Sequence, residues 1–163
     1  LSLYEPNAFG VLKLDNSPEQ NKLKEIIKEF GDIEQRMESL ESRISFAEEL
    51  LNFWLGEGSW SQLPKKLRTQ LVSMMKATSK DVYAALHSTI DLEPLKGLGH
   101  RVLMMFDPYT PYLAQAVTQR YLHILTDCTV KEFTHCGHLA PIFHAERVNQ
   151  CIATHINRLT QSN

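Results

Sequence analysis

The chain has 163 residues, of which 43% are hydrophobic and 22% charged, a composition typical of one globular domain with its own hydrophobic core. The formal net charge of −2 gives no basic footprint, and the longest apolar run, "VLMMF", is far shorter than a membrane span. Nucleic acid and membranes are therefore not expected partners. Three cysteines without a C-x-x-C pair favour a reducing, cytoplasmic compartment over a disulfide framework.

The first segment, "LSLYEP", is typical of a short buried strand over residues 1–4. This strand ends at Glu5 and Pro6, because proline cannot continue a central strand. The chain opens on the strand with no initiator methionine and no lead-in. We therefore expect these residues to be the C-terminal portion of a longer protein.

The segment from 14 to 96 is predicted to be almost wholly helical. Ser17 and Pro18 supply an N-cap and a first helical residue, with Gln20 placed to complete a capping box, and this helix stops at Gly31. Asp32 can cap the next helix, on which apolar residues alternate at spacings of four and three. These apolar residues are Ile33, Met37, Leu40, Ile44, Ala47, Leu51 and Trp54.

This apolar stripe has two interpretations, an amphipathic helix packed on its own protein or a dimerising coiled coil. The stripe covers only about three heptads, which favours the packed helix and leaves a homodimer as the alternative. The helix breaks at "GEGSW". Another helix restarts after Pro64, and Ser79 can cap a further one that ends near Ser88.

The pattern changes at Gly97, where strands and helices begin to alternate. "HRVLMMFDPYTP" predicts a buried strand and a turn, Thr110 and Pro111 start a helix, and "TVKEFTH" predicts another strand. The last helix carries its apolar residues, Val148, Ile152, Ile156 and Leu159, on one face. This alternation predicts an α/β fold with parallel strands and crossover helices. The helical segment 14–96 is then an insertion between a core strand within 1–13 and the C-terminal core, 97–163.

Three polar residues follow the predicted strands: Glu5 after the first, Asp107 after the second and His138 after the third. Ligands bind beyond the carboxyl ends of strands in open parallel sheets. A catalytic histidine needs a carboxylate that holds its tautomer and stabilises the imidazolium. The sequence therefore indicates a carboxylate–histidine site at this edge.

Three blocks of the chain resemble the α/β-hydrolase family. "GHLAPIFHAERVNQCIATHI" is similar to the end of that fold, and "LSLYEPNAFGVL" resembles the strand after the nucleophile elbow, often Leu-x-Leu-Tyr-Glu-Pro. "FWLGEGSWSQLP" is similar to a cap segment in one branch of the family. The blocks occur in family order and cover nearly the whole chain.

The resemblance implies that His138 is the base of a catalytic triad and that the helical insertion is a cap over the pocket. It also implies a G-x-S-x-G elbow before residue 1, since no serine here stands between glycines at that spacing. The triad acid stays open between two residues. Most members place an aspartate after the penultimate strand in a Gly-x-x-Asp loop, but this sequence departs from that pattern with "MMFDPYTP", in which Asp107 comes earlier than expected. The Leu-Tyr-Glu-Pro branch instead favours Glu5. The alternative role of Asp107 is to cap the turn that follows it.

Other chemistries find less support. His135, Cys136 and His138 cluster as metal ligands might, but 135 and 136 point to opposite faces of a strand and no second ligand pair has zinc spacing. We expect neither a metal nor a cofactor. Cys136 carries a nucleophilic sulfur but has no identifiable elbow. The remaining histidines are interpreted as surface or cap residues: His87, His100, His123, His144 and His155.

These observations predict a hydrolase that acts on a small ester or related acyl substrate, with a nucleophile outside residues 1–163, so that these residues alone are inactive. An aspartate nucleophile, as in dehalogenases and epoxide hydrolases, is an alternative on the same fold. A further alternative is a non-catalytic binding protein that dimerises through the stripe from Ile33 to Trp54. Aromatic residues of the insertion, including Phe53, Trp54 and Trp60, either line the pocket or form core, and core is the favoured interpretation.

Overall fold

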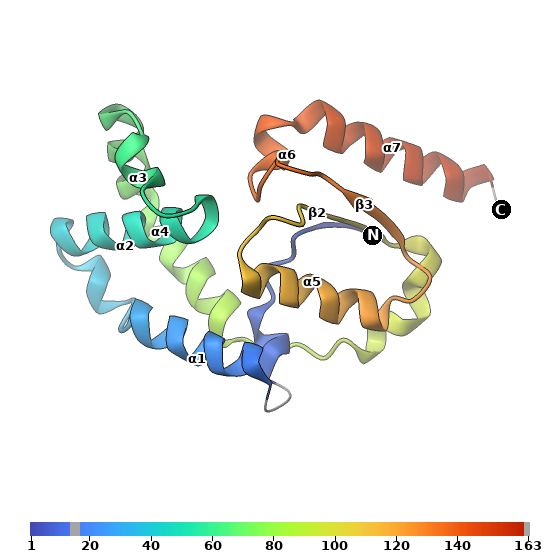
Figure 1. Ribbon diagram of the computed structural model, residues 1–163, viewed down its shortest axis with the longest axis horizontal. Coiled ribbons are helices and arrows are strands. Elements are labelled where there is room, and N and C mark those ends of the chain that lie inside the picture. Colours follow the sequence, from blue (N-terminus) through green and yellow to red (C-terminus); the bar gives the residue numbers. More distant parts are fainter. Residues whose placement is uncertain (14–16, 162–163) are drawn as a thin grey trace. The chain divides into compact units, whose positions relative to one another are not determined.

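Figure 1 shows the computed structural model of the chain, which describes residues 1–13 and 17–161. The fold is mixed α/β and divides into two compact units. Unit 1 combines residues 1–7 with 90–163, and unit 2 comprises 8–89. The division differs from the predicted insertion of 14–96, and residues 14–16 lie outside the described part of the chain. Unit 2 begins earlier because the 3-10 helix η1 (Phe9–Lys13) packs against helices of that unit.

Unit 1 contains a sheet of three parallel strands in the order β1-β2-β3. The strands are β1 (Ser2–Tyr4), β2 (Leu103–Phe106) and β3 (Thr129–Glu132). The helices of this unit are η3 (Glu93–Arg101) before β2, α5 (Tyr112–Ile124) between β2 and β3, and α6 (Ala140–Phe143) and α7 (Ala145–Gln161) after β3. The prediction of parallel strands joined by crossover helices is thereby confirmed.

The central strand β2 is covered on both faces. All of its residues are buried, and Figure 1 shows α5 and α7 on opposite sides of the sheet. Leu103 and Met105 point to the same face, where they pack with Phe133, Ala140 and Val148. A strand buried on both faces is typical of α/β proteins, and it gives the strand ends a rigid base.

Unit 2 is built from helices, with no strand among its described residues. Its elements are η1, α1 (Pro18–Phe30), η2 (Gln35–Met37), α2 (Leu40–Leu55), α3 (Ser59–Gln62) and α4 (Lys65–His87). Helix α1 begins at Pro18 as predicted, since the Ser17 hydroxyl accepts a hydrogen bond from the Gln20 N–H at 3.2 Å. The Gln20 side chain does not complete the predicted capping box and instead donates to the Lys13 carbonyl at 2.8 Å. The rings of Phe30 and Phe46 lie 5.5 Å apart and join α1 to α2.

The predicted continuous helix from Asp32 is wrong, because the chain folds there as η2 followed by a new helix, α2. Ser39 caps α2 by accepting the Ser42 N–H at 3.0 Å. The break divides the apolar stripe. Leu40 and Ile44 are 59% and 40% exposed, whereas the earlier stripe residues are buried.

The predicted break at Ser79 is also absent. Helix α4 runs through this residue, and the Ser79 hydroxyl donates to the Lys76 carbonyl one turn earlier. A serine that bonds back to its own helix satisfies its hydroxyl without ending the helix.

The buried face of α7 differs from the prediction at one position. Ile156 is 51% exposed, and His155, expected at the surface, is only 5% exposed. At 100° per residue, position 155 lies within about 20° of Val148 around the helix, whereas 156 lies about 80° away. The other four histidines interpreted as surface residues, at positions 87, 100, 123 and 144, are exposed.

None of the helices formed by the described residues is both long enough and apolar enough to cross a membrane.

Gly10 provides a test of the packing of unit 2. A Cβ atom at this position would lie 1.6 Å from the Ser88 carbonyl oxygen. We expect Gly10→Ala to lower the free energy of unfolding by about 1–3 kcal/mol, because the backbone must move to relieve the overlap. Urea denaturation measures this change. Gly97→Ala is the matched control, since a Cβ there meets nothing within 4 Å. Equal stability of the two variants would contradict the close approach at Gly10.

Candidate active site

The predicted site residues lie at the carboxyl ends of the strands in unit 1. Glu5 directly follows β1, and its N–H continues the strand pairing by donating to the Met105 carbonyl at 3.0 Å. Asp107 directly follows β2. On the third strand the pairing extends to the Phe133 N–H, which donates to the Phe106 carbonyl at 2.8 Å. His138 lies in the turn beyond, so all three predicted residues occupy one edge of the sheet.

The structure brings Glu5 and His138 into direct contact. The Oε2 atom of Glu5 lies 3.0 Å from Nδ1 of His138. The Glu5 side chain is buried, and the His138 side chain is 19% exposed. A carboxylate at Nδ1 accepts the proton on that nitrogen and leaves Nε2 as the basic nitrogen of the ring.

Glu5 is held by its second oxygen and by its backbone. Its Oε1 atom accepts the backbone N–H of Asp107 at 2.8 Å. The Glu5 φ angle is +39°, in the left-handed region that residues other than glycine rarely adopt. Such a conformation persists only where surrounding contacts impose it, and it is characteristic of functional sites.

Asp107 binds the turn that carries the histidine. Its Oδ2 atom accepts the Gly137 N–H at 2.7 Å, and its Oδ1 atom accepts the Tyr109 N–H at 2.9 Å. Burial alone would raise the pKa of Asp107, but the backbone N–H groups, led by that of Gly137, hold this pKa below its ordinary value. The side chain thus caps its own turn and also fixes the turn beside His138.

Gly137 and Tyr4 complete the support of this turn. Gly137 has a φ of +67°, and its carbonyl accepts the Tyr4 hydroxyl at 2.8 Å and the Ala140 N–H at 3.1 Å. Burial raises the pKa of Tyr4, and the charges of Glu5 and Asp107 add to this effect. Tyr4 therefore stays protonated and donates its hydrogen bond throughout the ordinary pH range.

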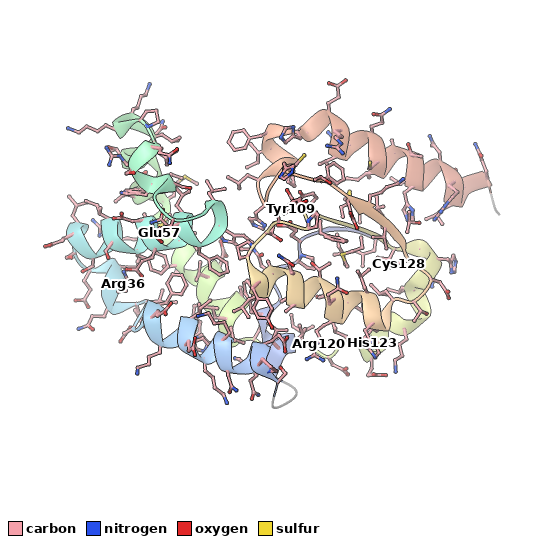
Figure 2. All side chains as sticks on the ribbon, viewed as in Figure 1. Arg36, Glu57, Tyr109, Arg120, His123 and Cys128 are labelled. Carbon is pink, nitrogen blue, oxygen red and sulfur yellow. The ribbon has the colours of Figure 1, made fainter. Side chains whose placement is uncertain are left out.

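The neighbouring residues His135 and Cys136 turn to other contacts. The His135 ring stacks on Tyr109 with centroids 4.3 Å apart, and Tyr109 is labelled in Figure 2. The Cys136 sulfur accepts from Arg147 at 3.3 Å. Within the described part of the chain, no three histidine, cysteine, aspartate or glutamate side chains gather as a metal site requires.

No sequence pattern predicts a role for Tyr4, because period-two alternation places position 4 on one face of the strand but does not reveal the partner of its hydroxyl. Asp107 is predicted as a candidate triad acid or as the cap of its own turn, but its bond to the turn that carries His138 is not. The bond from Asp107 to Gly137 joins residues thirty positions apart, which no local pattern indicates.

Comparison of the chain with protein-family models, with curated proteins and with solved structures gives no match. The arrangement of side chains in unit 1 is therefore the basis for a functional assignment. It comprises a buried carboxylate in contact with a partly exposed imidazole at the carboxyl edge of a parallel sheet, supported by a second carboxylate.

Replacement of Asp107 tests its role as the clamp of the turn. Asp107→Asn retains one acceptor oxygen and points an NH₂ group at either the Gly137 or the Tyr109 N–H. We expect a loss of about 1–3 kcal/mol in the free energy of unfolding at pH 7, measured by urea denaturation.

The pH dependence of this loss follows from the lowered pKa of Asp107. A carboxyl group whose pKa is lower in the folded state stabilises the fold above its unfolded pKa, about 4, and loses this contribution as the pH falls through the folded value. The stability difference between the original protein and Asp107→Asn should therefore shrink below about pH 4. Asp81→Asn, at an exposed position of α4, is the control. A difference that is constant from pH 7 to pH 3 would contradict the clamp.

Proposed function

We propose that Glu5 and His138 are the acid and the base of an α/β-hydrolase triad that cleaves an ester or a related acyl substrate. The observation that carries the proposal is the 3.0 Å contact between Glu5 Oε2 and His138 Nδ1. The pair lies beyond the carboxyl ends of parallel strands, where open α/β sheets bind ligands. Its carboxylate is buried and its imidazole is partly exposed, as a base that meets a reactant requires.

In this proposal the histidine transfers protons and the glutamate orients it. A serine hydroxyl attacks the acyl carbon while Nε2 of His138 takes its proton, and a tetrahedral oxyanion forms. The intermediate collapses as His138 returns the proton to the leaving alcohol. Water then attacks the acyl-enzyme by the same sequence, releasing the acid and the free serine. Glu5 stabilises the imidazolium at Nδ1 in both halves.

Glu5 rather than Asp107 is our proposed triad acid. Glu5 bonds the imidazole itself, whereas both carboxylate oxygens of Asp107 bond backbone N–H groups of the surrounding turns. Asp107 then acts as a positioning residue. It fixes Glu5 through its own N–H and fixes the histidine turn through Gly137.

The nucleophile and the oxyanion-hole donors are proposed to come from residues before Leu1. No G-x-S-x-G stands within the chain, and β1, the strand that resembles the one after the elbow, lies at an edge of the described sheet. An apolar strand at an edge offers unpaired backbone groups to a further strand. In the same proposal, unit 2 is the helical cap. The cysteines are unpaired, which fits a reducing, cytoplasmic compartment.

Variants of the triad residues in the full protein test this function. We expect His138→Ala to lower the rate of p-nitrophenyl ester hydrolysis by about 10²–10⁴-fold, because the general base is lost. Glu5→Gln keeps the shape of the side chain and removes its charge, so the turnover rate should fall while the substrate KM changes little. Circular dichroism checks that each variant folds.

His123→Ala is the matched control, since His123 lies near the end of α5 far from Tyr109 (Figure 2) and is exposed. Hydrolysis that survives His138→Ala would overturn the proposed base. A full protein with no esterase activity and no labelling by a fluorophosphonate would favour the non-catalytic alternative. A covalent alkyl-aspartate intermediate would instead favour the dehalogenase or epoxide hydrolase chemistry.

A further inference from the structure

A groove crosses unit 2 between the first turn of α2 and one face of α4. Its volume is about 610 Å³. On α4 the lining residues include Lys65, Arg68, Val72 and Lys76, whose spacings of three, four and four place them on one side of the helix. The groove therefore follows α4 for about three turns, a length of roughly 16 Å.

The floor of the groove is apolar. Trp60 and Val72 are buried at its base, and Leu40 and Ile44 of α2 expose 59% and 40% of their surface beside it. An apolar surface in contact with water gains free energy when a ligand covers it. The volume lies within the range of small-molecule sites, roughly 300–1,000 Å³.

The sides of the groove are cationic. Arg43, Lys65, Arg68 and Lys76 line it, and the lining contains no aspartate or glutamate among the described residues. In the described part of the chain, none of these four side chains forms an ion pair with a carboxylate. Their positive charge is therefore left without a neutralising partner at the groove.

The two arginines are already held in position. Arg43 donates to the Met37 carbonyl at 2.8 Å, and the Arg68 guanidinium lies 5.9 Å from the centroid of the Trp60 ring. Both are half-buried, so less side-chain entropy is lost when they bind an anion. A guanidinium offers paired N–H donors that match the oxygens of a carboxylate or a phosphate.

We propose that this groove binds an amphiphilic anion, a carboxylate or phosphate group attached to an aliphatic or aromatic body. The anionic head binds Arg43 and Arg68, and the apolar body covers Trp60, Val72 and the exposed part of Ile44. Lys65 and Lys76 add long-range attraction from the two ends. This site is separate in its residues from the proposed triad and does not depend on the catalytic proposal.

The combination of floor and sides selects this class of ligand. A free inorganic anion would leave the apolar floor in water, and a neutral amphiphile would leave four cations without a counter-charge and partly desolvated. An acidic helix of a partner protein has related chemistry, but the groove's volume of about 610 Å³ is in the range of small-molecule sites. Binding of such a peptide in place of the small anions is an outcome of the test below.

Isothermal titration calorimetry of the full protein tests the proposal with four probes: octanoate, octyl phosphate, octanol and inorganic phosphate. Octanoate and octyl phosphate are used below their critical micelle concentrations. We expect octanoate or octyl phosphate to bind with one-to-one stoichiometry, and the tighter of the two identifies the preferred head group. Octanol and inorganic phosphate, which carry only the body or only the charge, should bind at least about tenfold more weakly.

Two variants and one control assign the binding to the groove. Arg68→Gln should weaken octanoate or octyl phosphate about tenfold. Ile44→Glu, at an exposed position that tolerates a polar residue, should weaken it further by repulsion. Lys66 lies on the same helix but does not line the groove. Lys66→Gln should therefore leave the affinity for octanoate and octyl phosphate unchanged. His138→Ala should also bind normally, which separates this site from the triad.

The proposal is overturned if octanol binds as tightly as octanoate, or if Arg68→Gln and Lys66→Gln behave alike. It is also overturned if neither anion binds in a saturable way, or if an acidic amphipathic peptide binds the groove and the small anions do not. Anion binding that is lost in Arg68→Gln and kept in Lys66→Gln supports it.

Discussion

The contact between the Glu5 carboxylate and the His138 imidazole depends on the ends of three parallel strands. Glu5 reaches the imidazole with one oxygen, while its other oxygen is fixed by the Asp107 N–H. The Asp107 carboxylate in turn holds Gly137, the residue before the histidine. Each strand end thus supports the next. The central strand, buried on both faces, keeps the ends in register and positions the proposed catalytic pair.

The two carboxylates serve different purposes because their surroundings differ. Asp107 receives backbone N–H groups, which lower its pKa and keep it ionised as the clamp of two turns. Glu5 receives one backbone N–H, that of Asp107, and with its other oxygen it bonds the His138 imidazole. Asp107 therefore positions the turns around the site, whereas Glu5 orients the His138 imidazole. The cationic groove of unit 2 is chemically distinct, since it offers fixed positive charge over an apolar floor.

Much of this arrangement could be predicted from local patterns. Proline after Glu5, the apolar run before Asp107 and the glycine before His138 mark strand ends, and parallel strands bring such ends to one edge. The choice between Glu5 and Asp107 could not be made this way, because it depends on which carboxylate faces the ring after the turns have folded. Two predictions about helices were wrong for a similar reason, since each depends on contacts that form only in the folded chain. Ser39 interrupts the stripe by capping α2, and His155 rather than Ile156 completes the buried face of α7.

Proton NMR of the imidazole tests the central contact most directly. If Glu5 accepts the Nδ1 proton, the neutral His138 ring is the Nδ1–H tautomer, and its Nδ1 proton gives a downfield resonance that is absent from His138→Ala. In Glu5→Gln this resonance moves upfield or vanishes, because the charged acceptor is gone. An Nε2–H tautomer in the original protein, or an Nδ1 resonance that Glu5→Gln leaves in place, would contradict the proposed pair.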